Sequence, residues 1–295
     1  MISSFVACSN SEPIELIEDD VNFLEETGFI EFLEQESSSK KNLKIFYHIP
    51  EKSNNNSPIV FVFHGGGRNA KDYRDAMIAK SNEYNFIIVV PEFSNVNFPG
   101  GDGYNLGNVF VDGDNPSTGS LNTENEWAFS LIEPVFAFFK EKTGNTSQKY
   151  HIIGHSAGAQ FLHRFAMFKP DASFDKAIIS AAGWYTVPNL NIDFPYGLQK
   201  SSLESINLST FLSKNIKIIV GELDNNPNAG GLRRNSFADA QGINRFQRAY
   251  HFFNESKEFA SNNNTTFNWN IQTNFGLNHD FRAALQIASD LLFND

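Results

Sequence analysis

The sequence has 295 residues, of which 41% are hydrophobic and 19% are charged, a composition that supports a sizeable core and excludes global disorder. The formal net charge of −11 argues against non-specific nucleic-acid binding and against docking on anionic lipid. No segment reaches the run of about 18 apolar residues that a membrane-spanning helix needs. We therefore expect one large domain, with no transmembrane span and no nucleic-acid partner.

The chain begins with an acidic tail, residues 1–25, that holds its only cysteine, Cys8, so no intrachain disulfide can form. Phe5-Val6-Ala7-Cys8 resembles a bacterial lipobox, in which the cysteine becomes lipidated, although no Lys or Arg precedes it as in a complete signal peptide. We expect a lipid anchor at Cys8 and a location in the cell envelope or outside the cell. A cytoplasmic location is the alternative.

Beyond the tail, short apolar runs alternate with helix-like segments over residues 26–295. The runs 29–35 and 43–50 predict an opening antiparallel hairpin. Further strands are expected at 59–63, 86–93, 149–155, 176–183, 216–224 and 266–273. Helices are expected at 69–84, 124–144, 159–168, 237–260 and 280–293. This alternation predicts an α/β domain with a mostly parallel sheet covered on both faces, interrupted by insertions near 94–123 and 184–213.

One strand runs into Gly154-His155-Ser156-Ala157-Gly158, the G-x-S-x-G pattern of a nucleophile elbow. A tight turn between strand and helix needs small residues on both sides of an exposed serine. The pattern alone also fits an ordinary strand-to-helix turn, so it makes Ser156 a candidate nucleophile that needs partners elsewhere in the chain.

A serine nucleophile needs a histidine base and a carboxylate to orient that base, and in this fold they follow in the order Ser, acid, His. His251 lies within a helical pattern, whereas His279 lies between the last strand and the last helix, so we favour His279. Glu222 and Asp224 both follow a strand, and we favour Asp224 because it lies further into the loop.

An oxyanion hole is expected from the glycine-rich stretch His64-Gly65-Gly66-Gly67, which follows a buried strand. We expect the backbone N–H of Gly66, or secondarily of Gly65, to donate together with that of Ala157. A phosphate-binding loop is disfavoured because no Lys-Ser/Thr pair and no G-x-G-x-x-G pattern accompanies these glycines.

In combination, His64-Gly65-Gly66-Gly67, Gly154-His155-Ser156-Ala157-Gly158, Asp224 and His279 resemble the α/β-hydrolase superfamily over roughly residues 28–293. The chain looks most like secreted esterases of the polyhydroxybutyrate depolymerase and feruloyl esterase type. The resemblance implies the α/β-hydrolase fold and a serine esterase with no cofactor.

Other residues form weaker candidates for substrate binding. They are His64, Arg68, Trp184, Tyr185, Arg233 and Arg234. The arginines belong to a cluster that also holds Arg245 and Arg248, and this cluster either pairs with surface carboxylates or recognises an acidic or carbonyl-rich substrate. The loop 112–124 lacks the glycine and glutamate of a calcium-binding EF loop, and we expect no metal.

The leading hypothesis is hydrolysis of carboxylic esters, small or polymeric, with polyester, feruloyl and acyl-carbohydrate esters as the candidate substrates. A peptidase or amidase with the same residues is the first alternative, because fold and triad do not separate the two. A non-catalytic binding protein on the same scaffold is the second.

Overall fold

The computed structural model describes residues 24–33 and 42–294. Cys8 and most of the expected tail 1–25 therefore lie outside the described residues. Within the described part of the chain, no helix combines the length and the apolar character needed to cross a membrane.

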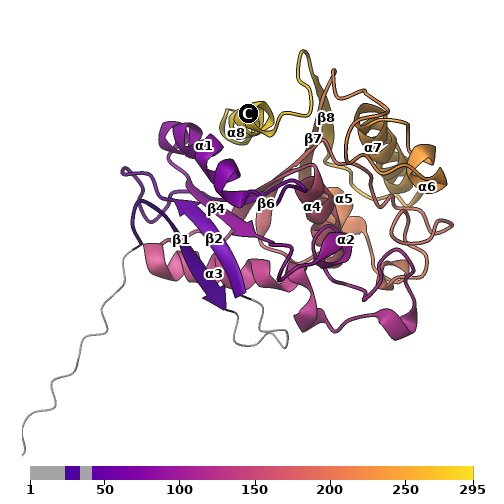
Figure 1. The fold of residues 1–295 in the computed structure, drawn as a ribbon, viewed down its shortest axis with the longest axis horizontal. Coiled ribbons are helices and arrows are strands. Elements are labelled where there is room, and N and C mark those ends of the chain that lie inside the picture. Colours follow the sequence, from indigo (N-terminus) through magenta and orange to yellow (C-terminus); the bar gives the residue numbers. More distant parts are fainter. Residues whose placement is uncertain (1–23, 34–41, 295) are drawn as a thin grey trace, which may run out of the picture.

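An eight-stranded sheet forms the centre of the molecule (Figure 1), with the strand order β1-β2-β4-β3-β5-β6-β7-β8. Its strands are β1 (Thr27–Leu33), β2 (Asn42–His48), β3 (Ile59–Phe63), β4 (Ile87–Glu92), β5 (Tyr150–His155), β6 (Phe174–Ser180), β7 (Asn215–Gly221) and β8 (Asn270–Asn274). The strands β3 to β8 are mutually parallel, and the predicted hairpin β1–β2 adds to them in antiparallel sense. The expected fold class is confirmed.

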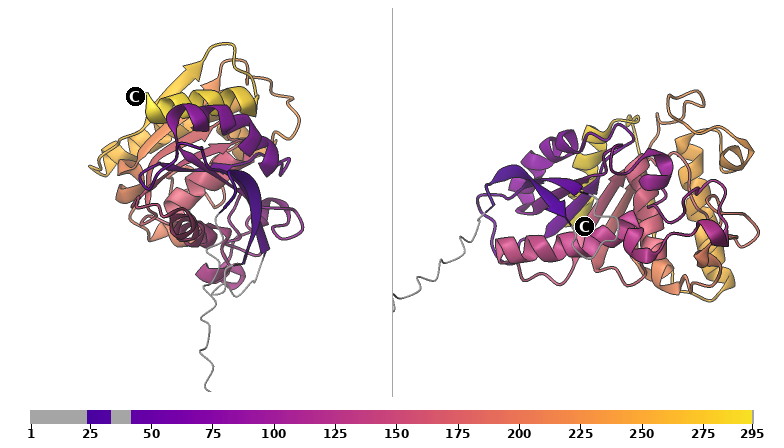
Figure 2. Two further views of the ribbon diagram at one scale, coloured as in Figure 1. Left: turned by 90° about the vertical axis from the view of Figure 1, so that its left-hand side faces the viewer. Right: turned by 60° about the horizontal axis from the view of Figure 1, so that its bottom comes forward.

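Helices cover both faces of this sheet (Figures 1 and 2). On one face, α1 (Ala70–Tyr84) and α8 (Phe281–Phe293) lie side by side. The other face carries α3 (Ile132–Thr143), α4 (Ala157–Phe168) and α7 (Arg245–Asn262). The short helices are α2 (Gly100–Gly103), α5 (Ser209–Ser213) and α6 (Ser236–Ala240).

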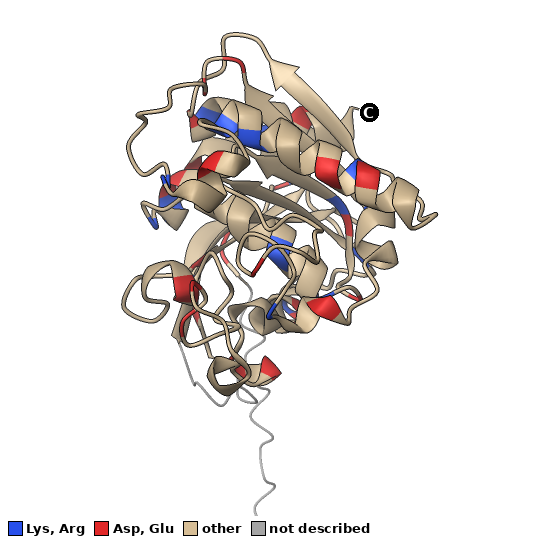
Figure 3. Ribbon diagram, turned by 90° about the vertical axis from the view of Figure 1, so that its right-hand side faces the viewer, with Lys and Arg blue, Asp and Glu red and all other residues tan. Residues whose placement is uncertain are grey.

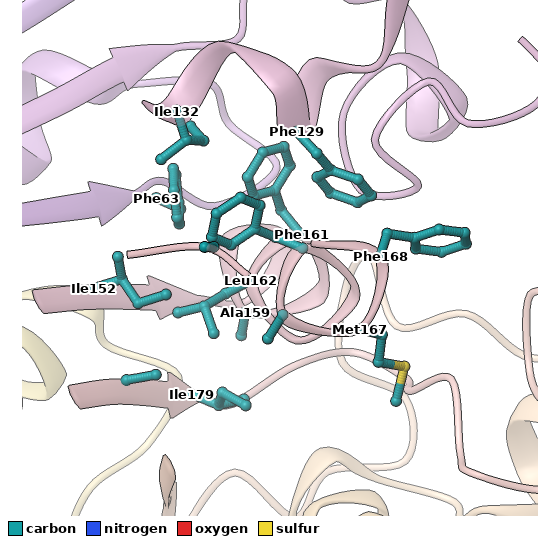
Figure 4. Close-up of a cluster of buried hydrophobic side chains, with 14 of the residues drawn as sticks. Phe63, Phe129, Ile132, Ile152, Ala159, Phe161, Leu162, Met167, Phe168 and Ile179 are labelled. Carbon is teal, nitrogen blue, oxygen red and sulfur yellow. The ribbon is translucent and has the colours of Figure 1, made fainter. Parts of the chain in front are cut away.

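Strand residues alternate between the two faces of the sheet, as the period of two requires. In β3, Phe61 and Phe63 join the core under α3 and α4, whereas Val60 and Val62 join the core under α1 and α8. Figure 4 shows Phe63, Ile152 and Ile179 on the side of the sheet that faces α4, with Phe63 next to Phe161. Both faces of the sheet are therefore buried in apolar cores, and the loops at its carboxyl edge extend from this buried base.

The helix expected at 124–144 begins later than predicted. Residues Glu124–Glu126 and Ala128–Leu131 form two 3₁₀ turns, and α3 starts only at Ile132. The break occurs at Trp127, whose backbone is extended and whose indole N–H donates to the Asn122 carbonyl at 3.0 Å.

The single helix expected at 237–260 is two helices, α6 and α7. Gly242 between them has φ of +136°, which a helix does not allow. Asn244 then starts a new helix, since its side chain accepts a hydrogen bond from the Gln247 backbone N–H. The apolar periodicity continues through this break, which is why the sequence pattern did not show it.

Candidate active site

Ser156 lies at the turn between β5 and α4, at the carboxyl edge of the sheet. Its backbone has φ of +55° and ψ of −114°, a conformation that a non-glycine residue keeps only when its surroundings impose it. A Cβ atom on Gly154 would lie 2.5 Å from the Gly158 carbonyl oxygen, and one on Gly158 would lie 2.0 Å from that of Phe63. Both flanking glycines are thus required by backbone contact, and the serine side chain remains partly exposed.

The structure brings Ser156, His279 and Asp224 into one hydrogen-bonded chain. The Nε2 atom of His279 is 3.0 Å from the Ser156 hydroxyl, and its Nδ1 atom is 2.7 Å from Oδ2 of Asp224. Because an ionised carboxylate only accepts, Nδ1–H donates to Asp224 and Nε2 is left to accept from the serine hydroxyl. This is the arrangement that a general base for Ser156 requires.

The loops that carry Asp224 and His279 pack backbone against backbone. Leu223 N–H donates to the Leu277 carbonyl at 2.9 Å. A Cβ atom on Gly221, at the end of β7, would lie 2.1 Å from the same oxygen. This close approach fixes the separation of the acid and the histidine before their side chains meet.

The glycine-rich loop after β3 is held by the imidazole of His64. This fully buried ring donates through Nδ1 to the Gly65 carbonyl at 2.9 Å and accepts through Nε2 from the Phe93 N–H at 3.1 Å. Burial lowers the pKa of His64 to about 4, so the ring is neutral at neutral pH. His64 therefore supports the loop instead of facing a substrate.

The Gly65 carbonyl also accepts from the Arg68 N–H at 3.1 Å. Since the peptide bond is trans, the Gly66 N–H points away from that bonded carbonyl. The Ala157 N–H, at the first residue of α4, has no intrahelical acceptor. These two groups are available to an oxyanion next to Ser156, and Gly65 lies beside the Ser156 Cβ, 3.6 Å from a Cβ built on the glycine.

Tyr73 of α1, which the sequence did not single out, links three parts of the site. Its hydroxyl is 3.0 Å from Nδ1 of His155 and hydrogen-bonds the Gly65 backbone. Its ring stacks on Phe281 at 4.2 Å, two residues after His279. No local pattern marks a tyrosine within a helix for this role.

His155 packs directly against the candidate base, with its ring centroid 4.7 Å from that of His279. Burial, together with the nearby His279 and Arg245, lowers its pKa well below the usual range. A neutral imidazole therefore fills the space behind His279 without adding charge.

Two residues expected to bind substrate have their polar groups engaged or buried within the protein. The guanidinium of Arg68 donates to the backbone carbonyls of Phe93, Phe98 and Gly100, so it braces the loop after β4. Tyr185 is fully buried and stacks on Phe252 of α7 at 4.4 Å.

Trp184 and Arg233, two further candidates for substrate binding, contact each other. Two guanidinium groups contact the Trp184 ring, that of Arg164 at 4.2 Å and that of Arg233 at 4.7 Å from its centroid. Arg233 forms a two-pronged ion pair with Asp114, at 2.6 and 2.9 Å.

The exposed Arg234 pairs with Asp239, whose carboxylate also accepts from the buried Arg248 at 3.0 Å. Figure 3 shows Lys and Arg interspersed with Asp and Glu on this side of the molecule. Pairing with carboxylates, one of the two readings of the arginine cluster, thus accounts for these side chains. In the residues that the structure describes, no group of three or more His, Cys, Asp or Glu residues is placed to hold a metal ion.

Comparison with known proteins gives clear structural relatives. The chain is similar to poly(aspartic acid) hydrolase-1 from Sphingomonas sp. KT-1, with 36% identity, a TM-score of 0.83 and coverage of 90% of this chain and 98% of that one. It is also similar to LpqC, a poly(3-hydroxybutyrate) depolymerase from Bordetella parapertussis, with 29% identity, a TM-score of 0.84 and coverage of 91% and 89%.

A more distant likeness reaches the siderophore hydrolase EstB from Aspergillus nidulans, at 15% identity and a TM-score of 0.55 over 92% of this chain and 96% of that one. At this identity the likeness concerns the fold alone. Neither a scan against protein-family models nor a search of curated proteins gave a match.

Proposed function

Because this chain belongs to the α/β-hydrolase superfamily and is a hydrolase of its esterase type, we propose that Ser156, His279 and Asp224 are its catalytic triad. His279 takes the Ser156 proton as the hydroxyl attacks the substrate carbonyl, and then returns it to the leaving group. Asp224 holds the base in the required tautomer. The observation that carries the proposal is the unbroken hydrogen-bonded chain at 2.7 and 3.0 Å that ends on a strained elbow serine.

The oxyanion of the tetrahedral intermediate binds to the backbone N–H groups of Gly66 and Ala157 in this proposal. The Gly65 N–H, the secondary candidate, already donates to the Tyr73 hydroxyl. Such donors act in the transition state more than on the bound ester, so they contribute to kcat. One N–H group comes from the glycine-rich loop and the other from the first residue of α4, and Tyr73 and His64 hold the loop beside the elbow.

The preferred reaction is hydrolysis of carboxylic esters outside the cell, with polyester, feruloyl and acyl-carbohydrate esters as the substrate classes. Three adjoining hollows of about 630, 320 and 600 Å³ lie along the segment that follows β6, but neither the proposed triad nor the glycine-rich loop lines them, so they do not define the substrate. The first two share Tyr196 and Phe237, and the last two share Pro116 and Lys200. The Tyr196 ring, which lines the first two hollows, packs on the Trp184 ring of the segment that follows β6, with 4.8 Å between the centroids.

Cleavage of amide bonds is the second candidate. One observation favours it: the protein of 36% identity is a hydrolase of poly(aspartic acid), a polymer joined by amide bonds. Matched ester and amide substrates with the same acyl group separate the candidates. The ester assignment predicts a kcat/KM at least about a hundredfold higher on the ester, and faster turnover of the amide would replace it.

Variants of the three triad residues test the proposal. Glu222 and His251, the alternative acid and base, serve as controls. We expect Ser156→Ala to lose at least about a thousandfold in kcat on a soluble ester, since a triad serine has no substitute. Asp224→Asn and His279→Ala should fall by at least about a hundredfold, whereas the controls Glu222→Gln and His251→Ala stay near wild type. A Ser156→Ala variant that keeps more than a tenth of wild-type kcat would contradict the triad.

We also propose that Cys8 carries a lipid anchor that places the enzyme in the cell envelope. The support is the lipobox-like Phe5-Val6-Ala7-Cys8 and the acidic stretch that follows. Fractionation of cells that express the gene with its native upstream codons tests this. Cys8→Ala should leave the membrane fraction with full activity, and wild type found wholly in the cytosol with Met1 intact would refute the anchor.

A further inference from the structure

A buried arginine lies directly behind the carboxylate of the proposed triad. Arg245 is the first residue of α7, and its Nη1 atom is 3.4 Å from Oδ1 of Asp224. The other oxygen of that carboxylate bonds to His279 at 2.7 Å. Phe246 N–H donates to the Asp224 carbonyl at 3.2 Å, which ties the start of α7 to the acid loop.

Arg245 differs from the other arginines of its cluster in its surroundings. Its side chain is 5% exposed and that of Asp224 is 4% exposed. Within the described residues, its guanidinium hydrogen-bonds Asp224 and the Gly230 carbonyl, the latter at 3.4 Å, and its Nε has no hydrogen-bond partner. Keeping a guanidinium out of water with so few partners is costly, so its charge is directed at the one carboxylate that it meets.

We infer that Arg245 is a positioning residue of the proposed active site: it holds the Asp224 carboxylate toward His279 and places a positive charge next to this acid–base pair. This inference rests on the proposed function, because it assigns a role within the same triad. The base must be neutral to accept the serine proton, so a charge held next to its carboxylate bears directly on the pH dependence of the reaction.

The charges that face His279 support this reading. Asp224, from the loop after β7, is the carboxylate that bonds His279. Glu222 of the same loop is exposed and accepts from the Gly276 N–H at 3.5 Å instead. His155, from the end of β5, and Ser156, from the start of α4, are uncharged neighbours, as is Tyr73 of α1 behind His155.

At the start of α8, the Asp280 carboxylate accepts from the Arg282 N–H, and the Arg282 guanidinium lies over the Phe281 ring. Asp280 and Arg282 carry opposite charges, and these contacts of both residues lie at the start of α8. The buried charges behind His279 are therefore the Asp224 carboxylate and the Arg245 guanidinium. Removal of Arg245 leaves that carboxylate without its buried positive partner.

The pH profile of kcat/KM on a soluble ester tests the inference in the full chain. Arg245→Gln should move the acidic limb to higher pH by about one unit, since the lost charge acts across a poorly solvated site. It should also lower the maximum by about tenfold, mainly through kcat, because the carboxylate loses its support. Arg245→Lys keeps the charge and should restore the position of the limb.

Two further variants complete the experiment. Arg234→Gln removes an exposed guanidinium from the same cluster, and its limb should stay at the wild-type position. Arg245→Met provides a second neutral variant that keeps most of the side-chain volume. Folding of each variant is checked by far-UV circular dichroism and by thermal melting.

The inference is overturned if a folded neutral variant keeps the wild-type acidic limb. It is also overturned if both neutral variants fail to fold, because Arg245 would then serve the stability of the fold alone. Loss of activity in Ser156→Ala combined with an unmoved limb in Arg245→Gln would leave the proposed triad in place and refute only this role. Full activity in Ser156→Ala would refute the triad itself.

Discussion

Replacement of Tyr73 by Phe removes one hydroxyl group from the centre of the site and leaves the packing in place. That hydroxyl joins the Gly65 backbone of the glycine-rich loop to Nδ1 of His155 in the elbow. The ring would still stack on Phe281 at 4.2 Å. The change therefore isolates the connection between the two loops from the bulk of the side chain.

The size of the effect follows from the burial of the groups that lose their partner. Tyr73 and His155 are 2% and 3% exposed, and Gly65 is buried. Each buried polar group left without a partner costs about 1–3 kcal/mol, and two groups lose one, so we expect Tyr73→Phe to lose about 2–6 kcal/mol of unfolding free energy. A shifted glycine loop also weakens an oxyanion donor, and complete loss of one such donor costs about a hundredfold or more in kcat. We expect kcat to fall by about tenfold to a hundredfold with little change in KM.

The assay compares Tyr73→Phe with Tyr84→Phe on a soluble ester and in urea unfolding. Tyr84 lies at the other end of α1, and its hydroxyl bonds Asp290 at 2.7 Å, far along the helix from the elbow. Its kcat should stay within about twofold of wild type. If Tyr73→Phe also keeps kcat within twofold while folded, the hydroxyl does not position the glycine loop and this reasoning is refuted.

Two other outcomes test the packing and the charges of the site. Gly158→Ala should lower the melting temperature by more than about 5 °C and abolish turnover, since its Cβ would lie 2.0 Å from the Phe63 carbonyl oxygen. A Cβ on Gly119 meets open space, so the control Gly119→Ala should melt like wild type. Equal melting temperatures for the two variants would contradict the tight packing at the elbow. Because the pKa of His64 is lowered to about 4, the unfolded state binds its proton first, so unfolding free energy should fall by about 3 kcal/mol from this group between pH 6.5 and pH 4. Urea melts of wild type and His64→Asn over that range should show a smaller loss in the variant, and parallel losses would count against the buried neutral ring.

The elements that form the site were predictable where a local pattern dictated them. Buried strands read as apolar runs, and Gly154 and Gly158 flank Ser156 because backbone contacts leave no room for side chains. The order of Ser156, Asp224 and His279 along the chain follows from the strands that precede them. The sequence could therefore place these residues at one edge of the sheet before any contact was known.

The remaining features depend on contacts between distant segments, and no periodicity carries them. Tyr73 lies 82 residues from His155, to which it bonds, and nothing in its own helix marks that contact. Arg245 was expected only as one member of an arginine cluster, because burial against Asp224 is a property of the folded chain. The break at Gly242 is hidden for a different reason. The apolar pattern continues across this residue, although the helical backbone stops there.

The assignment of Ser156 as the nucleophile is tested most directly by covalent labelling. The folded chain is treated with a fluorophosphonate, and the adduct is counted by intact mass and located by peptide mapping. We expect one adduct per chain, located on Ser156, with none on Ser156→Ala and none on wild type unfolded beforehand. A fully folded wild-type chain that takes up no label, or that takes it up on another residue, would contradict the account.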